Sequence, residues 1–204
     1  FNSSTANNGA SGGGVGTVGF FSVTDLTNHL TDTTRSLFVY RQFVYPATTT
    51  LAIQNITVSN AGTLTFGGSS TPTLSGTLLV TGTSTIIFQS SNNTTQVGGE
   101  WIGTGVTINA ANIQVDSNSI ITANGQGYQG TAGGTSGCPD GPRGPGGGPF
   151  NCNNSGNGAS HGGLGGGPNQ GVTYGTSTAP IALGSGCSGS CCSSGSGGSG
   201  GGAI

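Results

Sequence analysis

The chain has 204 residues, of which 44 are Gly, and only 4% are charged, with three basic residues against five acidic ones and a formal net charge of −2. So few basic side chains leave almost nothing to neutralise phosphates, which argues against nucleic acids and anionic membrane surfaces as partners. No apolar run approaches the roughly 20 residues of a membrane-spanning helix, so membrane insertion is not expected.

The content of Asn, Ser, Thr and Cys favours an extracellular or cell-surface location. The chain has five Cys and no Met and starts at Phe1, which fits an oxidising compartment and a removed secretory signal. With so few charges, attached sugar is the expected source of solubility, and we favour Asn55 and one of Asn92 or Asn93 as carriers. The Asn-x-Ser/Thr sequons lie at Asn2, Asn55, Asn92, Asn93 and Asn153.

Residues 1–46 are interpreted as an N-terminal Gly/Ser/Asn arm followed by an apolar assembly strand. The segment SLFVYRQFVYP would carry apolar side chains on both faces of one strand. Soluble monomers rarely leave such a surface exposed, so residues 33–46 are predicted to lie at a subunit interface or in a neighbouring copy. Burial in the chain's own core is the alternative. The predicted interface residues are Phe38, Val39, Tyr40, Phe43, Val44 and Tyr45.

Residues 47–122 are predicted to form a β-rich core. Short segments such as LAIQNITV, GTLTF, LSGTLLV, STIIF, EWIG, NIQVD and SIIT are separated by Gly, Asn, Ser or Pro turn signals. Branched residues alternate with polar ones, and no window has a helical apolar stripe, so the fold class is all-β. The irregular short spacing favours a parallel β-helix-like solenoid with long Gly-rich loops, and a β-sandwich or jelly roll is the alternative.

Residues 123–204 are Gly-rich and contain all the cysteines, and we expect this region to pack on the core. The stretch GPRGPGGGP has too few triplets for a collagen helix and favours a polyproline-II-like loop. Cys138 and Cys152 bracket that loop and are the predicted local disulfide, worth about 3 kcal/mol for a loop of about 15 residues. Cys187, Cys191 and Cys192 would then share one further bond, leaving an intermolecular bridge or a free thiol.

The segments VTINAANIQVDSNSIITANGQGYQG, GPGGG, ASHGGLGGG, YGTSTAPIALGSG and GGSGGGAI follow one another in this order. The order resembles the Gly-rich parallel β-helix regions of large bacterial surface and secreted proteins, over about residues 50–204. There a polar strand ladder ends in a turn, a Gly-rich excursion follows, and GGGAI opens the next rung. The resemblance implies a fold more than an activity. This chain departs from it in stopping at Ile204 and in carrying the last three cysteines where glycines are common.

Candidate catalytic and metal-binding residues are sparse, and we expect neither an enzyme nor a cofactor. Asp140 and Arg143 are interpreted as a surface pair in a Pro/Gly loop. His29 and His161 are the only histidines, and no Cys/His spacing matches a zinc site. Carbonyl-rich loops with Asp116 or Asp140 leave room for a structural calcium ion, although no D-x-D-x-D-G loop is present.

We therefore expect an extracellular structural protein, a protomer of a glycosylated filament or surface assembly formed by strand addition between copies. Its partners would be other copies of itself and covalently attached glycans. The alternative is a trimmed adhesive domain of a large surface protein, contacting glycans through Trp101, Tyr128 and a Thr-rich face. Recurring Thr-x-Thr triplets keep ice binding as a minor alternative.

Overall fold

The computed structural model describes residues 19–22, 36–45, 53–131, 143–148, 157–167, 169–176, 178, 180–189 and 195–204, with the backbone alone for 19–22. The chain divides into two compact units, which are taken separately. The strand unit comprises residues 1–88 and 107–122, and the glycine-rich unit comprises residues 89–106 and 123–204. Several predicted residues lie outside the described ones: Asn2, His29, Cys138, Asp140, Cys152, Asn153, Cys191 and Cys192.

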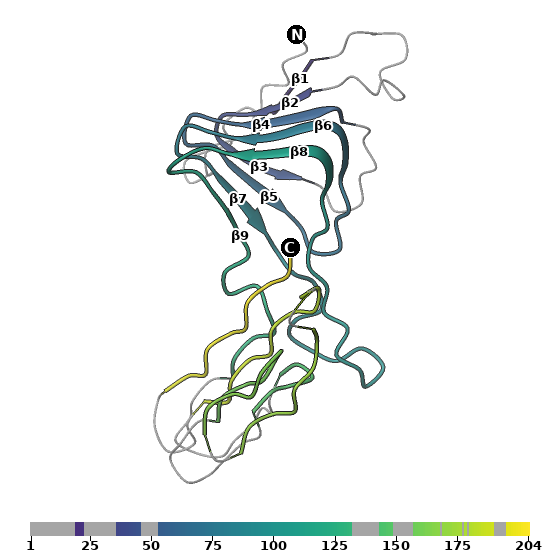
Figure 1. Cartoon of the computed structure of the whole chain (residues 1–204), viewed down its shortest axis with the longest axis vertical. Coiled ribbons are helices and arrows are strands. Elements are labelled where there is room, and N and C mark those ends of the chain that lie inside the picture. Colours follow the sequence, from purple (N-terminus) through teal and green to yellow (C-terminus); the bar gives the residue numbers. More distant parts are fainter. Residues whose placement is uncertain are drawn as a thin grey trace, which may run out of the picture. The chain divides into compact units, whose positions relative to one another are not determined.

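The described part of the strand unit is all-β, as predicted, and contains two sheets whose strands are mostly parallel (Figure 1). Sheet 1 has the order β1-β2-β4-β6-β8, and sheet 2 has the order β3-β5-β7-β9. The strands are β1 Gly19–Ser22, β2 Ser36–Val39, β3 Gln42–Tyr45, β4 Asn55–Val58, β5 Thr63–Phe66, β6 Thr73–Val80, β7 Thr85–Phe88, β8 Asn109–Val115 and β9 Ile120–Thr122.

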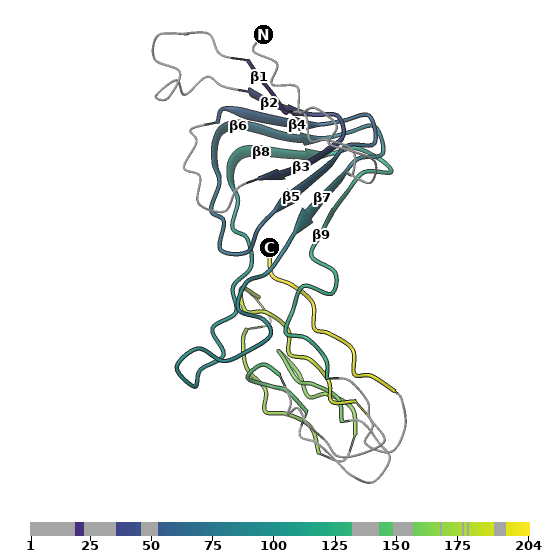
Figure 2. The same cartoon turned by 180° about the vertical axis from the view of Figure 1, so that it is seen from behind.

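From β2 onward the chain alternates between the two sheets, so that each even-numbered strand joins sheet 1 and each odd-numbered strand joins sheet 2 (Figures 1 and 2). Ile56 pairs with Leu78 in sheet 1, and Thr63 pairs with Thr85 in sheet 2, so at this step both sheets advance by the same number of residues. All these pairs are parallel, and only β1 runs antiparallel to its neighbour, β2.

The core of the strand unit lies between the inner faces of the two sheets, because alternate residues of each strand point inward. In sheet 1, register partners such as Leu37 and Ile56 are fully buried. In sheet 2, an aromatic column runs through Tyr45, Phe66 and Phe88, with ring centroids 5.1 and 5.5 Å apart. Uniform columns of this kind need only one inward apolar residue at each register position, which is why a chain so poor in hydrophobic residues can bury a core.

The segment SLFVYRQFVYP is not the single strand expected. The chain bends at Tyr40 and Arg41, and its halves become β2 in sheet 1 and β3 in sheet 2. Val39 is fully buried and Tyr45 is 3% exposed, so these two predicted interface residues belong to the chain's own core. The bend turns what would be two apolar faces of one strand into inward faces of two sheets. Phe38 and Phe43 are half-buried, and Tyr40 and Val44 are exposed.

The domain limits also differ from those predicted. β2 and β3 pair directly with β4 and β5, so no boundary falls at residue 46. Residues 89–106 belong to the glycine-rich unit and not to the predicted β-rich core. The expected strand EWIG is absent there, and Val97 and Glu100 instead form an isolated antiparallel bridge.

Candidate functional site

The last pair of strands, β8 and β9, is named here the open rung, because no described strand pairs with its outer side. Ile113 and Val115 are in register with Leu78 and Val80, which are fully buried. Register partners in a parallel pair point to the same face, so Ile113 and Val115 also face inward. They are nevertheless 50% and 43% exposed. The apolar core therefore reaches the end of the sheets uncovered.

The edge of the open rung lacks the usual protection against strand addition. Natural edge strands carry Lys, Pro, bulges or inward charges that prevent pairing with another chain. β8 reads NAANIQV and contains neither a charged residue nor proline. The pairing irregularity between β6 and β8 lies before Asn112, and from there to Val115 the register is regular. The backbone of this stretch is a suitable template for a further strand.

Asp116 follows β8 and is the charged group nearest to it in sequence. Its Oδ2 accepts a hydrogen bond from Thr81 Oγ1 at 2.5 Å, and its Oδ1 accepts one from Gln114 Nε2 at 3.1 Å. These bonds, that from Thr81 above all, lower the pKa of the carboxyl below its ordinary value, while desolvation opposes them. The carboxylate therefore already has protein donors. Among the residues that the structure describes, no group of three or more His, Cys, Asp or Glu could hold a metal ion.

The described sequons differ in how free their amide nitrogens are. Asn55 is half-buried, and its Nδ2 lies 3.4 Å from Ser36 Oγ. Asn93 is half-buried and donates from Nδ2 to Gly127 O at 3.0 Å. Asn92 is exposed. Glycosylation at these positions stays a prediction, and Asn92 offers the most accessible acceptor.

The glycine-rich unit contains three extended segments, residues 127–131, 184–187 and 197–201, that hydrogen-bond in a closed cycle. We name them the glycine array. The backbone bonds are Tyr128 N to Gly184 O at 2.8 Å, Thr131 N to Cys187 O at 3.1 Å, Gly184 N to Gly201 O at 2.9 Å, Cys187 N to Gly198 O at 3.0 Å, Gly200 N to Tyr128 O at 3.0 Å and Gly197 N to Thr131 O at 2.9 Å. In these six bonds the two donors of each segment are three residues apart, which is the period of polyproline II and not that of a strand. Gly127 N donates in addition to Gly200 O at 2.8 Å.

Glycine is required where the segments of the array meet. A Cβ on Gly200 would collide with the backbone of Gly184, and one on Gly197 would collide with the carbonyl of Cys187. Only glycine allows such close approach, as at the axis of collagen. The Gly-rich composition, which resembles a linker, therefore encodes a packed structure.

Tyr128 anchors a small apolar cluster with Leu183 and Ala203, against which Trp101 packs. Its side chain is 2% exposed, and its hydroxyl accepts a hydrogen bond from Gly103 N at 2.9 Å. Burial raises the pKa of this phenol. Trp101 meets the ring edge-on, with centroids 5.2 Å apart. Tyr128 is therefore not available for stacking on a sugar, contrary to its role in the adhesive alternative.

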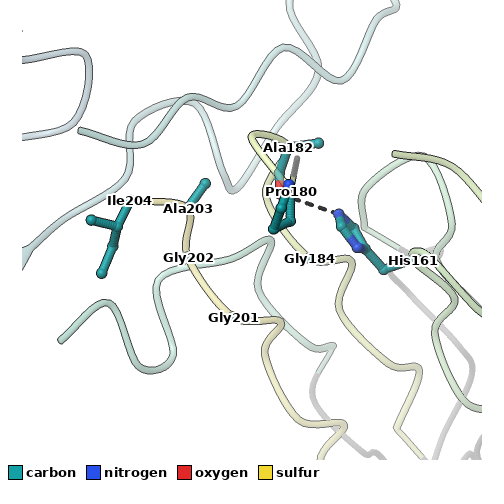
Figure 3. A pocket seen from close by; sticks show the side chains of 8 residues that line it. All are labelled: His161, Pro180, Ala182, Gly184, Gly201, Gly202, Ala203 and Ile204. Carbon is teal, nitrogen blue, oxygen red and sulfur yellow. Dashed lines mark hydrogen bonds between the residues drawn. The ribbon is translucent and has the colours of Figure 1, made fainter. Parts of the chain in front are cut away.

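A groove of about 490 Å³ lies beside the array (Figure 3). His161, Pro180, Ala182, Ala203 and Ile204 line it together with backbone glycines. His161 Nε2 lies 3.2 Å from Ala182 O, and its ring packs edge-on against Tyr174. The imidazole is thus held by a backbone carbonyl and has no nucleophile or carboxylate partner among the lining residues. The lining of the groove is mostly apolar, and its side chains include no acid and base pair for catalysis.

Arg143 and Cys187 are the other predicted residues that the structure describes. Arg143 donates from its guanidinium to Gln129 Oε1 at 2.8 Å. Cys187 is half-buried with a free thiol, so within the described structure it forms no disulfide. Pairing among the other cysteines lies outside the described residues and stays a prediction.

Sequence reasoning found the segments NIQVD and SIIT but missed that the strands they form, β8 and β9, are the last described ones. The available signal was the change at residue 123 from β-branched alternation to glycine-rich sequence. Among the described residues no strand follows that change, so β8 and β9 have no described rung after them.

Comparison of the chain with protein-family models, with curated proteins and with solved structures gives no match. Within the described ranges there is no helix that could cross a membrane.

Proposed function

We propose that this protein is an extracellular structural protein, a β-solenoid protomer of a filament or surface assembly whose copies join by strand addition. Alternation of the chain between two parallel sheets supports the solenoid, because sandwiches and jelly rolls are built from antiparallel strands. The proposal includes covalently attached glycans and extracellular disulfides, and it includes no catalysis or cofactor.

The observation that carries this proposal is the exposure of Ile113 and Val115 on an edge without charge or proline. Each further rung stacked on β8 and β9 would bury these side chains and satisfy the free backbone groups of the edge at once. Burial of apolar surface contributes about 25 cal/mol per Å². The backbone hydrogen bonds fix the orientation and register of the added strand. Assembly is therefore expected at the open rung and not through residues 33–46 as a single docked strand.

The adhesive alternative has weaker support. It needs aromatic faces open to a sugar, and Tyr128 is buried while Trp101 is half-buried against it. The groove of Figure 3 offers no polar side chain besides His161 to orient hydroxyl groups.

The test compares the wild-type chain with Val115→Asp, using Val97→Asp as the matched control. Val97 is an exposed valine of similar exposure, 49% against 43%, and it belongs to the glycine-rich unit. Light scattering and negative-stain electron microscopy should show oligomers or fibres for the wild type and for Val97→Asp. Val115→Asp should form no fibres, because a charge on the inward face opposes burial at the open rung. Its circular dichroism spectrum should be unchanged. Equal assembly of all three proteins would overturn the proposal.

A further inference from the structure

We infer that the partner at the open rung is the open rung of a second copy, joined antiparallel about a two-fold axis through Gln114. This inference rests on the proposed function, since it specifies which surface the added strand comes from. It commits to a closed contact between two identical ends, so further growth would use the opposite ends of the sheets.

The shapes of the two ends favour this arrangement. At the open rung both sheets end together, since β8 and β9 are separated by only a short turn, residues 116–119. At the opposite end, among the described residues, sheet 1 extends one strand further, because β1 pairs outside β2 while β3 is the last strand of sheet 2. Two ends at which both sheets stop at the same rung can pair through both sheets. Such an end leaves a gap when it meets an end at which one sheet is a strand longer. Head-to-tail stacking would therefore leave one sheet unpaired at each junction.

The backbone of β8 is oriented correctly for such pairing. Asp116 N donates to Val80 O at 2.9 Å, on the side of β6. Backbone groups alternate between the two sides of a strand, so those of Ile113 and Val115 point away from β6 to the open edge. In an antiparallel pair centred on Gln114, Ile113 lies opposite Val115 of the second copy. These two residues can then exchange both of their backbone hydrogen bonds.

The side chains of β8 are also self-complementary about this axis. On the inward face, Ile113 of each copy would cover Val115 of the other copy. On the outer face Gln114 would meet Gln114, an amide that both donates and accepts. Asn112 would lie opposite Asp116, which pairs a donor with a carboxylate and avoids facing like charges. Such an isologous contact is the commonest way in which identical chains pair.

The experiment is oxidative cross-linking of single-cysteine additions in the full chain. The residues at the centre of the pair, Gln114 of each copy, form a non-hydrogen-bonded pair with Cα atoms about 4.5 Å apart, within the range for a disulfide. Gln114→Cys should therefore give a covalent dimer containing a 114–114 peptide on oxidation. Asn112→Cys is the matched control on the same outer face, and it should give no 112–112 peptide because it lies opposite Asp116. The wild-type chain is the control for cross-links between the native cysteines.

The outcomes separate this inference from the proposed function. Absence of the 114–114 peptide, with assembly still lost in Val115→Asp, would overturn the two-fold pairing and leave strand addition intact. A 112–112 peptide in place of the 114–114 peptide would also overturn the stated axis. If Val115→Asp assembles as the wild type does, strand addition at the open rung fails, whatever the cross-links show.

Discussion

Asn55 Oδ1 accepts a hydrogen bond from the backbone N of Thr77 at 2.9 Å. The bond lies where β6 has an extra residue, because its pairing with β8 shifts between Leu74 and Thr77. Gly76 packs against the same amide, and a Cβ there would collide with Asn55 Oδ1. The Asn55 side chain thus replaces a ladder hydrogen bond at the bulge. Its role in the fold is to hold β6 in register with β4.

Removal of this amide should destabilise the strand unit. Asn55→Ala leaves the Thr77 N–H without its acceptor, at a cost of about 1–3 kcal/mol. Asn55→Asp keeps the accepting oxygen and should lose much less. Urea denaturation followed by circular dichroism measures both variants. Equal stability of Asn55→Ala and the wild type would show that water replaces the amide without cost.

Glycan occupancy should be higher at Asn92 than at Asn55 or Asn93, because the amide nitrogens of the latter two have protein partners. Thr94→Ala destroys the sequon of Asn92, and Thr95→Ala destroys only that of Asn93. Glycopeptide mass spectrometry of the secreted chain should find the sugar lost in the first variant and kept in the second. Predominant modification of Asn55 would contradict the accessibility argument.

The strands of the strand unit were largely predictable. The segments GTLTF, LSGTLLV, STIIF and SIIT coincide with β5, β6, β7 and β9 to within a residue or two. Alternation of branched and polar residues indicates a half-buried strand whatever the partner is. The bend at Tyr40 and Arg41 was not predictable, because no Gly or Pro marks it and alternation continues through it.

The glycine array could not be predicted from local sequence. Gly127 and Gly130, and Gly197 and Gly200, have the three-residue spacing of polyproline II. The same spacing occurs by chance wherever glycine is frequent, and nothing in the sequence says that residues 127–131 pair with 184–187 and 197–201. The open rung likewise depends on which strand comes last in each sheet, a property of topology and not of periodicity.

Substitution by alanine should affect stability differently at two adjacent glycines of the array. Gly200→Ala places a methyl group against the backbone of Gly184 and should cost about 1–3 kcal/mol or more. A Cβ on Gly201 meets nothing within 4 Å, so Gly201→Ala should be neutral or stabilise by about 0.4–1 kcal/mol through the unfolded state. Hydrogen exchange of the Gly184 and Cys187 amides reports the difference. Equal protection in both variants would show that the segments do not pack as described.

The pKa of Asp116 predicts a loss of stability in acid. Its carboxyl has a folded-state pKa below the ordinary value, mainly because of the Thr81 hydrogen bond. The stabilisation is therefore fully present above the unfolded pKa of about 3.9 and disappears as pH falls through the folded value. Asp116→Asn should reduce the difference in unfolding free energy between pH 5 and pH 2. If the variant and the wild type have the same pH profile, the Thr81 bond does not persist in solution.

Phe66 should be the most sensitive core position of sheet 2. Its ring is fully buried between Tyr45 and Phe88, so Phe66→Ala removes two ring contacts and leaves a cavity. The expected cost is about 3–5 kcal/mol, against well under that for Phe66→Leu, which refills most of the volume. Val44→Ala on the neighbouring strand is the control, because Val44 is 53% exposed and should change stability by less than about 0.5 kcal/mol. Hydrogen exchange of the β5 and β7 amides measures the strand unit directly. Similar protection in Phe66→Ala and Val44→Ala would mean that the aromatic column does not stabilise sheet 2.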